Sequence, residues 1–144
     1  MDPTIRTAEL ADLPAVLALW RAADSIPSVT DSEAGLRTLL ARDPEALLVV
    51  DAGREAGGGI VGTLIAAWDG WRGSFYRLAV RPERRRQGVA AALVRAGEER
   101  LARLGAVRIT AIVADHEHAA VALWEAVGYV RQADRSRFVR ELAG

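Results

Sequence analysis

Apolar residues recur at helical spacing near the start of the chain. Asp12 belongs to a residue type that often caps the N-terminus of a helix. It is followed by Leu13, Val16, Leu17 and Trp20. This spacing predicts an amphipathic helix that Asp12 caps. A short strand at residues 5–8 is expected before it.

A second helix is predicted shortly before the first central strand. Thr30 and Glu33 have the spacing of a capping box, and Pro44 cannot continue a helix. The apolar face of this helix is short and consists of Leu36, Leu39 and Leu40. Two helices are therefore expected to precede the sheet.

Runs of apolar, partly β-branched residues predict the strands. They are "LLVVD" from residue 47, "IVGTLIAAW" from residue 60, "FYRLAV" from residue 75 and "VRITAIV" from residue 107. The polar, glycine-rich stretch 52–59 indicates a hairpin between the first two. The sequences "YVRQ" and "SRFVREL", residues 129–132 and 136–142, are interpreted as closing strands.

Two further helices are predicted, from about residue 87 to residue 104 and from about residue 119 to residue 127, with Gly105 and Gly128 ending them. The buried side of the longer helix is expected to hold Val89, Leu93, Ala96, Gly97, Leu101 and Leu104. Because strand, helix and strand over residues 75–113 require a crossover, the two strands should be parallel neighbours. The sequence predicts an α/β (α+β) fold, a mixed sheet flanked by helices, in one domain over residues 1–144.

Composition narrows the function classes. The chain has 144 residues, a net charge of zero, no cysteine and no lysine, so thiolate chemistry, Schiff-base lysines and Walker-type phosphate loops are excluded. Net neutrality argues against non-specific binding to nucleic acid. The first 16 residues lack a secretion signal, and no apolar run approaches the roughly 20 residues that span a bilayer. We therefore expect a cytoplasmic protein without membrane or nucleic-acid partners.

Two weaker motifs have simpler explanations. Gly57, Gly59 and Gly62 match a dinucleotide fingerprint, but they precede and enter a strand, so a flexible hairpin explains them better. His116 and His118 form a pair that could begin a metal site or move a proton. Without cysteine or a third histidine, a polar loop is the simpler interpretation, and we expect no metal.

The stretch "VRPERRRQGVAAAL", residues 80–93, lies where a predicted strand ends and the long helix begins. The first amides of a helix lack partners and carry the positive end of its dipole, so they can bind phosphate oxygens. Gly88 would let a ligand approach the backbone. The alternative is a solvated arginine turn followed by good helix formers, and the residues alone leave both open.

This stretch resembles motif A of the GNAT superfamily of acyl-CoA-dependent N-acetyltransferases, with Arg85, Gly88 and Ala90 on its defining positions. A second family motif is similar to "EHAAVALWEAVGY", which matches at Ala120, Leu123, Gly128 and Tyr129. The distance between the motifs and the upstream order of elements also fit. The resemblance therefore extends over nearly the whole chain.

The resemblance implies a central splayed sheet whose strands 75–80 and 107–113 separate to admit the pantetheine arm of acetyl-CoA. The backbone of residues 78–80 would bind the pantetheine amides, and the amides of residues 86–91 would bind the pyrophosphate. The implied cofactor-binding residues are Leu78, Ala79, Val80, Arg85, Arg86, Gln87, Gly88, Val89, Ala90, Ala91, Glu117 and Trp124.

At several family positions this chain carries a different residue. Trp124 replaces the usual tyrosine, and an indole N–H can donate a hydrogen bond but not transfer a proton. Trp124 could equally be a core residue. Glu117 replaces an asparagine, while Ser74 and Ile112 stand where some members carry a catalytic glutamate.

The catalytic candidates are therefore Trp124, Ser74 and Tyr76, which shares a face with Ser74 and Leu78 if the strand is regular and could orient water. The implied function is transfer of an acetyl group from acetyl-CoA to a primary amine, on a small molecule or a peptide N-terminus, by direct attack in a ternary complex. A non-catalytic acyl-CoA-binding module is the alternative.

The acceptor side is less defined. The stretch "WDGWRGSFY" places two tryptophans and Asp69 before the third strand, where an aromatic and acidic rim would suit a cationic amine. A surface turn explains the same residues and is slightly favoured. A homodimer through the last strands is a further alternative for the assembly.

Overall fold

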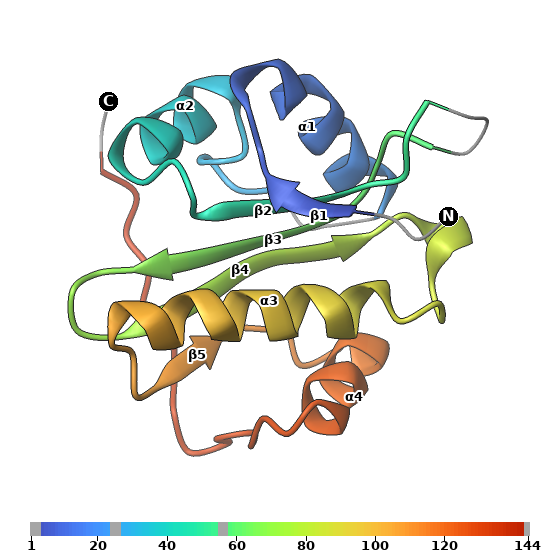
Figure 1. Cartoon of the computed structure of the whole chain (residues 1–144). Coiled ribbons are helices and arrows are strands. Elements are labelled where there is room, and N and C mark those ends of the chain that lie inside the picture. The colour runs from blue at the N-terminus through green and yellow to red at the C-terminus, as the bar shows by residue number, and fades with distance from the viewer. Residues whose placement is uncertain (1–3, 24–26, 55–57, 143–144) are drawn as a thin grey trace. The chain divides into compact units, whose positions relative to one another are not determined.

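The computed structural model describes residues 4–23, 27–54 and 58–142, and Figure 1 shows the path of the chain. Contacts divide the chain into two compact units, Met1–Ile112 and Val113–Gly144. Each unit is described by itself. Gly57, one of the three glycines of the fingerprint, lies outside the described residues.

A mixed sheet organises the described part of the first unit, with its strands in the order β1-β2-β3-β4-β5. The pairs from β1 to β4 are antiparallel, and β4 and β5 are parallel. The strands are β1 (Thr4–Thr7), β2 (Leu47–Asp51), β3 (Ile60–Trp68), β4 (Gly73–Val80) and β5 (Ile109–Ala111). The predicted parallel pair around a crossover helix is confirmed.

Helices cover both faces of this sheet (Figure 1). The one-turn helix η1 (Leu10–Asp12) leads into α1 (Leu13–Ala22), and α1 and α2 (Glu33–Arg42) pack on one face. The crossover helix α3 (Val89–Leu104) lies on the other face and ends, as predicted, at Gly105. Apolar side chains from α1, α2 and the sheet form the core between them, including Leu13, Val16, Trp20, Leu36, Leu47, Val49 and Ile65.

Both early helices begin differently from the prediction. Asp12 occupies the N-cap position of α1, but its carboxylate makes no capping bond to that helix and instead accepts from Arg6 and from Glu9 N. Helix α2 is capped by Ser32, whose Oγ accepts from Gly35 N at 3.0 Å, rather than by Thr30. Thr30 and Ser32 both carry a hydroxyl shortly before the helix, and the extended backbone at Ser32 lets its side chain reach the free amides.

The strand predicted at residues 107–113 is shorter than expected, since β5 covers only Ile109–Ala111. The prediction of two closing strands is wrong, because residues 129–132 and 136–142 form no strand. Apolar alternation supplies a buried face, but a strand also needs a neighbouring backbone to accept its hydrogen bonds. Leu104, expected on the buried side of α3, is 43% exposed.

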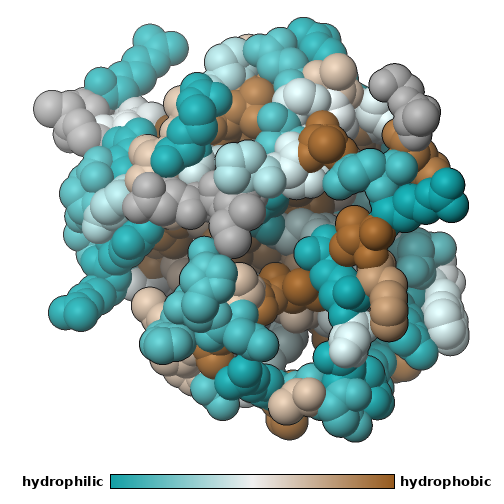
Figure 2. Space-filling model, turned by 180° about the vertical axis from the view of Figure 1, so that it is seen from behind, coloured by the Kyte–Doolittle hydropathy of each residue, from teal (hydrophilic) through white to brown (hydrophobic). Residues whose placement is uncertain are grey.

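In the second unit, α4 (His118–Ala126) is followed by Val127 and the turn at Gly128, close to the predicted end. On the face of the molecule shown in Figure 2, apolar side chains interrupt the polar surface at several places. Across the described ranges, no helix has both the length and the apolar character needed to cross a membrane.

Candidate active site at the end of β4

The junction between β4 and α3 leaves the first amides of a long helix without intrahelical acceptors, next to an exposed turn. After β4 the chain forms the one-turn helix η2 (Pro82–Arg84) and a turn, and α3 begins at Val89. The first intrahelical bond is donated by Ala92 N to Gly88 O at 3.0 Å. The amides of Val89, Ala90 and Ala91 precede it and so have no acceptor within the helix. They form the positive end of a helix of 16 residues.

Backbone conformation keeps this helix end accessible. Gly88, the residue before α3, has φ +79°, and a Cβ built on it would meet no atom within 4 Å. Arg86 also has a positive φ, 65°, which is unusual for a residue with a side chain. Gln87, Gly88 and both preceding arginines are exposed. A ligand can therefore approach the amides from solvent.

The arginines of this junction have different roles. Arg81 holds the β2–β3 hairpin, because its guanidinium donates to Gly58 O at 2.9 Å and to Ile60 O at 3.1 Å. Arg85 and Arg86 are exposed instead, and within the described residues neither forms an ion pair. The cluster thus combines a structural arginine with solvated ones beside the helix end.

Strands β4 and β5 separate beyond a short paired region. Gly73 lies opposite Ile109 and Phe75 opposite Ala111, where β5 ends. Strand β4 continues to Val80, so within the described part of the first unit its edge beyond Phe75 has no strand beside it. Because β5 ends at Ala111, β4 alone extends beyond the paired region and has the open edge that the predicted splay requires.

The open edge of β4 presents particular backbone groups. Arg81 N donates to Val61 O at 2.8 Å, and alternate residues of a strand face the same neighbour. The backbone of Ala79 therefore faces β3, while that of Leu78 and Val80 faces the open edge. The side chain of Ala79 is buried.

A bulge interrupts β4 between Tyr76 and Ala79, beside the backbone groups of the open edge. Thr63 pairs with Ala79 and Ile65 with Tyr76, so β4 has one residue more than β3 in this interval. Arg77 lies in the bulge with φ +54°.

The bulge changes which side chains share a face. Ser74 and Tyr76 lie opposite Ala67 and Ile65, which pack against the α1 and α2 core, and Ala79 also packs there. The expectation that Leu78 shares the face of Ser74 and Tyr76 is therefore wrong, because the bulge shifts the alternation by one residue. Tyr76 is 49% exposed.

Sequence reasoning missed the side chains that hold this bulge. The guanidinium of Arg77 binds the carboxylate of Asp31, 46 residues away, and Thr63 Oγ1 donates to Arg77 O at 2.9 Å. No motif links these positions. An arginine within an apolar strand was the available signal, because a partly buried charge requires a partner.

The remaining candidates belong to the second unit. Trp124 is 8% exposed, and its ring meets that of Tyr129 edge-on with centroids 5.0 Å apart. Glu117 is the N-cap of α4, without a capping bond from its side chain. His116 and His118 are exposed, and over the described ranges no three carboxylate or imidazole groups gather as a metal site.

The tryptophan-rich stretch before β4 is a self-contained turn. Asp69 Oδ1 accepts from Arg72 N at 2.7 Å and from Trp71 N at 2.8 Å, and these hydrogen bonds, that of Arg72 first, lower the pKa of this carboxyl. The guanidinium of Arg72 covers the Trp71 ring at 4.1 Å. Two of the groups that could attract a cationic amine, Asp69 and the Trp71 ring, thus have partners inside the turn.

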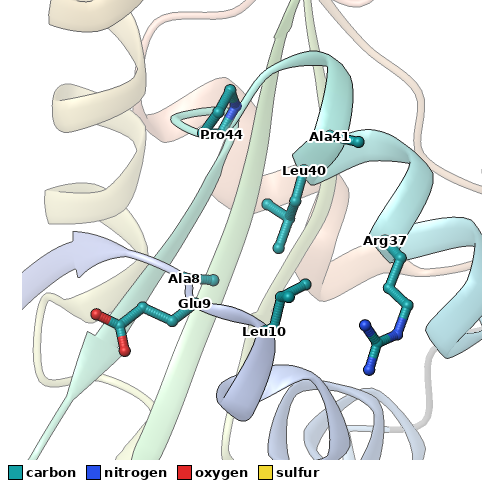
Figure 3. A pocket seen from close by; sticks show the side chains of 7 residues that line it. All are labelled: Ala8, Glu9, Leu10, Arg37, Leu40, Ala41 and Pro44. Carbon is teal, nitrogen blue, oxygen red and sulfur yellow. The ribbon is translucent and has the colours of Figure 1, made fainter.

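A hollow elsewhere in the first unit contains none of the predicted site residues. It lies between the segment after β1 and helix α2 (Figure 3). Its lining is mainly apolar and consists of Ala8, Glu9, Leu10, Arg37, Leu40, Ala41 and Pro44.

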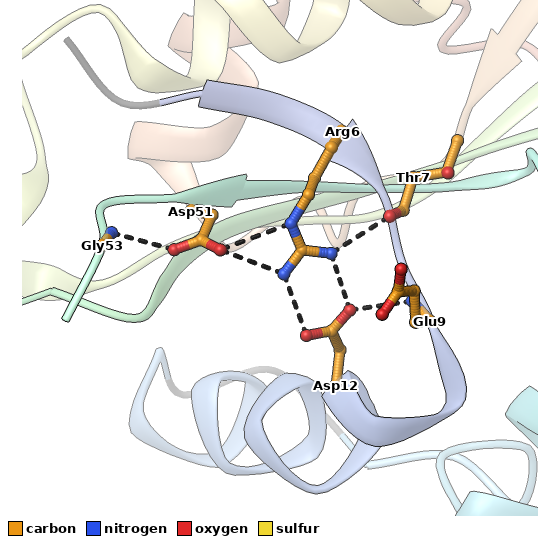
Figure 4. Close-up of polar contacts among 6 residues, drawn as sticks. All are labelled: Arg6, Thr7, Glu9, Asp12, Asp51 and Gly53. Atoms are coloured by element: carbon orange, nitrogen blue, oxygen red, sulfur yellow. Dashed lines mark hydrogen bonds and ion pairs between the residues drawn. The ribbon is translucent and has the colours of Figure 1, made fainter.

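Three ionisable groups with shifted pKa values, Arg6, Asp12 and Asp51, form a network on the β1 side of the sheet, with β2 and β3 between β1 and β4. Arg6 binds Asp12 at 2.7 Å and Asp51 at 3.0 Å (Figure 4). The hydrogen bond from Arg6 is the main cause of the lowered pKa of Asp12, and the amide of Gly53 is the main cause for Asp51. The pair of carboxylates raises the pKa of Arg6 above its usual range, Asp12 contributing most. This network joins β1, β2 and the start of α1.

Comparisons with known proteins agree with this geometry. The profile of the acetyltransferase (GNAT) family matches residues 14–129. An acetyltransferase of Yersinia enterocolitica is 33% identical over 128 residues, which cover 89% of this chain and 88% of that protein.

Solved structures share the fold. Ard1 from Thermoplasma volcanium superposes with a TM-score of 0.77 at 20% identity, covering 92% of this chain and 86% of its own. The PaiA N-acetyltransferase from Thermoplasma acidophilum, solved in complex with coenzyme A, has a TM-score of 0.76 at 14% identity and 94% coverage of each chain. The sequence match and the splayed sheet lead to one conclusion: this chain belongs to the GNAT family of acetyltransferases.

Proposed function

We propose that the protein is an N-acetyltransferase that transfers an acetyl group from acetyl-CoA to a primary amine, and that residues 1–144 form a single catalytic domain. The acceptor is a small-molecule amine or a peptide N-terminus. The observation that carries the proposal is the accessible N-terminus of α3 directly after the open edge of β4. Family membership supplies the reaction class.

The cofactor site follows from the chemistry of the exposed backbone. Pyrophosphate oxygens need several N–H donors and positive potential, which the amides of residues 86–91 offer beside Arg85 and Arg86. The pantetheine arm carries amides that can pair with a strand edge, and Leu78 and Val80 present such an edge. Ala79 contributes by packing, and Glu117 and Trp124 are assigned to the same ligand by the family motif.

The reaction is direct attack by the amine nitrogen on the thioester carbonyl. A new C–N bond forms, the C–S bond breaks, and the amine proton leaves with solvent or passes to the thiolate. Positioning and a backbone N–H toward the oxyanion supply most of the rate. A terminal amine with a pKa of about 8 is partly deprotonated at neutral pH and can attack without a general base, whereas a lysine-like amine requires one.

Side chains near β4 have assisting roles in this proposal. Tyr76, half exposed on the face that carries Ser74, orients a water that receives the amine proton. Trp124 offers an indole N–H or a wall beside the sulfur, but no proton.

The alternative is a non-catalytic acyl-CoA-binding module. One observation favours it: Trp124, at the position of the usual proton-donating tyrosine, is buried against the ring of Tyr129. Turnover separates the two functions. With acetyl-CoA and a panel of amines and N-terminal peptides, the enzyme should release free thiol and yield an acetylated product by mass spectrometry. Thiol release no faster than buffer for every acceptor would favour the binding module.

The cofactor site is tested by two matched glycine variants. Gly88 and Gly105 flank the same helix, both have positive φ, and a Cβ at either would meet no atom within 4 Å. Gly88→Trp should reduce the affinity for CoA in calorimetry by about 100-fold, the equivalent of two charge-assisted hydrogen bonds. Gly105→Trp should show comparable backbone strain and unchanged affinity. Equal affinity in both variants would contradict the placement of the pyrophosphate.

A further inference from the structure

The bulge of β4 is enclosed by a connected set of side chains, which we call the Arg77 clamp: Trp20, Asp31, Thr63 and Arg77. Thr63 Oγ1 donates to Arg77 O at 2.9 Å and accepts from Trp20 Nε1 at 2.8 Å. The guanidinium of Arg77 binds both oxygens of Asp31, at 3.0 and 2.5 Å. It also lies over the Trp20 ring, 5.6 Å from its centroid. The clamp thus holds both the main chain and the side chain of Arg77.

The clamp joins four segments at one point. Trp20 comes from α1, Thr63 from β3 and Arg77 from β4, while Asp31 lies just before α2 and also accepts from Ser28 N at 3.0 Å. Trp20 and Thr63 are buried, and the side chains of Arg77 and Asp31 are 22% and 15% exposed. A bidentate pair shielded to this extent has a fixed geometry, unlike an exposed ion pair.

Such a clamp has a local reason to exist. Arg77 has φ +54°, and a strained backbone of this kind persists only where its surroundings hold it. The same bulge lets the backbone of Leu78 face the open edge while Tyr76 faces the α1 and α2 side. The relation between those two residues therefore depends on the conformation of Arg77.

We infer that Arg77 and Asp31 are positioning residues for acetyl transfer. They keep the backbone of Leu78, which binds the acyl arm, in register with Tyr76, which faces the acceptor, and they anchor the loop before α2 beside both. The inference rests on the proposed function. It adds that an ion pair outside the motifs of the sequence sets the geometry of the reacting groups.

The first test is Asp31→Asn, which removes the charge and leaves the side-chain shape. Loosening the bulge would move the thioester carbonyl away from the attacking amine. A misplacement of about 1 Å between reacting groups can lower the rate by about 100-fold. We expect kcat to fall by about 10- to 100-fold. The KM for acetyl-CoA should change by less than about threefold, because the pyrophosphate is held at α3, away from the clamp.

Arg77→Lys tests the bidentate geometry. Lysine keeps the charge but offers a single point donor, so it should lower kcat nearly as much as Arg77→Gln. The double variant Asp31→Asn with Arg77→Gln should be no slower than either single variant, because both act through one contact. Full activity in Arg77→Lys, or additive losses in the double variant, would overturn the assignment.

The matched control is Asp12→Asn. Asp12 also binds an arginine through both carboxylate oxygens, at 2.7 and 3.0 Å, and its side chain is similarly shielded, 16% exposed. It lies at the start of α1, outside the clamp. Asp12→Asn should lose stability while keeping kcat within about twofold, whereas a merely structural clamp would leave the two variants with the same kcat.

A second readout needs no turnover and so separates this inference from the proposed function. Deuterium uptake at Tyr76 and Ala79, whose amides face β3, should rise in Asp31→Asn and stay unchanged in Asp12→Asn. Unchanged uptake in Asp31→Asn overturns the clamp even if the enzyme is active. A wild-type protein without turnover, but with the expected uptake, would contradict the proposed function alone and leave the clamp supported.

Discussion

Arg77 and Arg86, with φ of 54° and 65°, are the non-glycine residues in the left-handed region among those the structure describes. Both lie between the middle of β4 and the start of α3, the segment assigned to the acyl arm and the pyrophosphate. Strained backbone of this kind gathers at functional sites, where the surrounding structure holds it. The two arginines thus lie where the two proposed parts of the cofactor site begin, the strand edge at Leu78 and Val80 and the amides of residues 86–91. Their side chains differ, since Arg77 is clamped and Arg86 is exposed.

The Arg6 network gives a pH prediction at the same scale. The folded-state pKa of Asp12 is lowered, chiefly by Arg6, and that of Asp51 chiefly by Gly53 N. In the unfolded chain these carboxyls have a pKa of about 4. Because their pKa is lower in the folded state, the unfolded chain binds more protons around that pH. The stabilisation is therefore complete above that pH and is lost as the pH falls through the folded pKa values.

We expect the free energy of unfolding, from urea titrations between pH 7 and pH 3, to fall below about pH 4. Asp12→Asn should cost about 1.5 kcal/mol at pH 7 and flatten the decline. Asp134→Asn removes one partner of an exposed ion pair with Arg135 and serves as the control. It should change neither the free energy of unfolding at pH 7 nor its decline at low pH. A decline of the same depth in Asp12→Asn would show that other carboxylates cause it.

At the scale of elements, glycines line the contact between α3 and the sheet and leave no room for a Cβ. A Cβ on Gly97 would lie 2.7 Å from the Phe75 ring, on Gly62 2.9 Å from Val89, and on Gly73 2.8 Å from Leu101. Gly62, which the sequence placed where the chain enters a strand after the glycine-rich hairpin, is therefore a packing residue inside β3. This close packing fixes the direction in which the N-terminus of α3 points.

Gly97→Ala tests this contact, because two effects oppose each other. Alanine in a helix gains about 1 kcal/mol over glycine, while overpacking costs about 1–3 kcal/mol. With Phe75 and Leu64 both within 3.0 Å of the new Cβ, we expect a net loss of about 1 kcal/mol.

Exposed Ala102→Gly calibrates the helix preference alone and should cost about 1 kcal/mol. Chemical denaturation of both variants gives the comparison. A more stable Gly97→Ala would mean that the sheet yields to the methyl group.

At the scale of the first unit, a partly buried ion pair joins the two helical layers. Arg100 of α3 is 6% exposed; its Nε donates to Ala66 O at 3.2 Å, and its Nη2 binds the carboxylate of Asp43, the residue that ends α2. The pair thereby links α3 on one face of the sheet to the C-terminal end of α2 on the other. Removing Arg100 would take this donor from both the shielded Asp43 carboxylate and Ala66 O, and would empty a buried side-chain position.

Arg100→Met should therefore lower the free energy of unfolding by about 3 kcal/mol. Arg95→Met, an exposed arginine on the same helix, should change it by less than about 0.5 kcal/mol. Thermal unfolding monitored by circular dichroism compares them. Similar melting temperatures for the two variants would show that the pair contributes no net stability.

The sequence by itself determined the order of helices and strands up to α4, the parallel pair around the crossover and the family. These features depend on local periodicity, on turn residues such as Gly88 and Gly105, and on motif spacing, all of which are written within a few neighbouring residues. The tertiary structure decided the rest: the cap at Ser32, the bulge that turns Leu78 away from the face of Tyr76, and the Asp31–Arg77 pair. The tertiary structure also contains no strand at residues 129–132 and 136–142, although the sequence pattern predicted one at each. Each of these depends on which backbone or charge lies beside a residue in space, and contacts between segments tens of residues apart leave no periodic trace in the sequence.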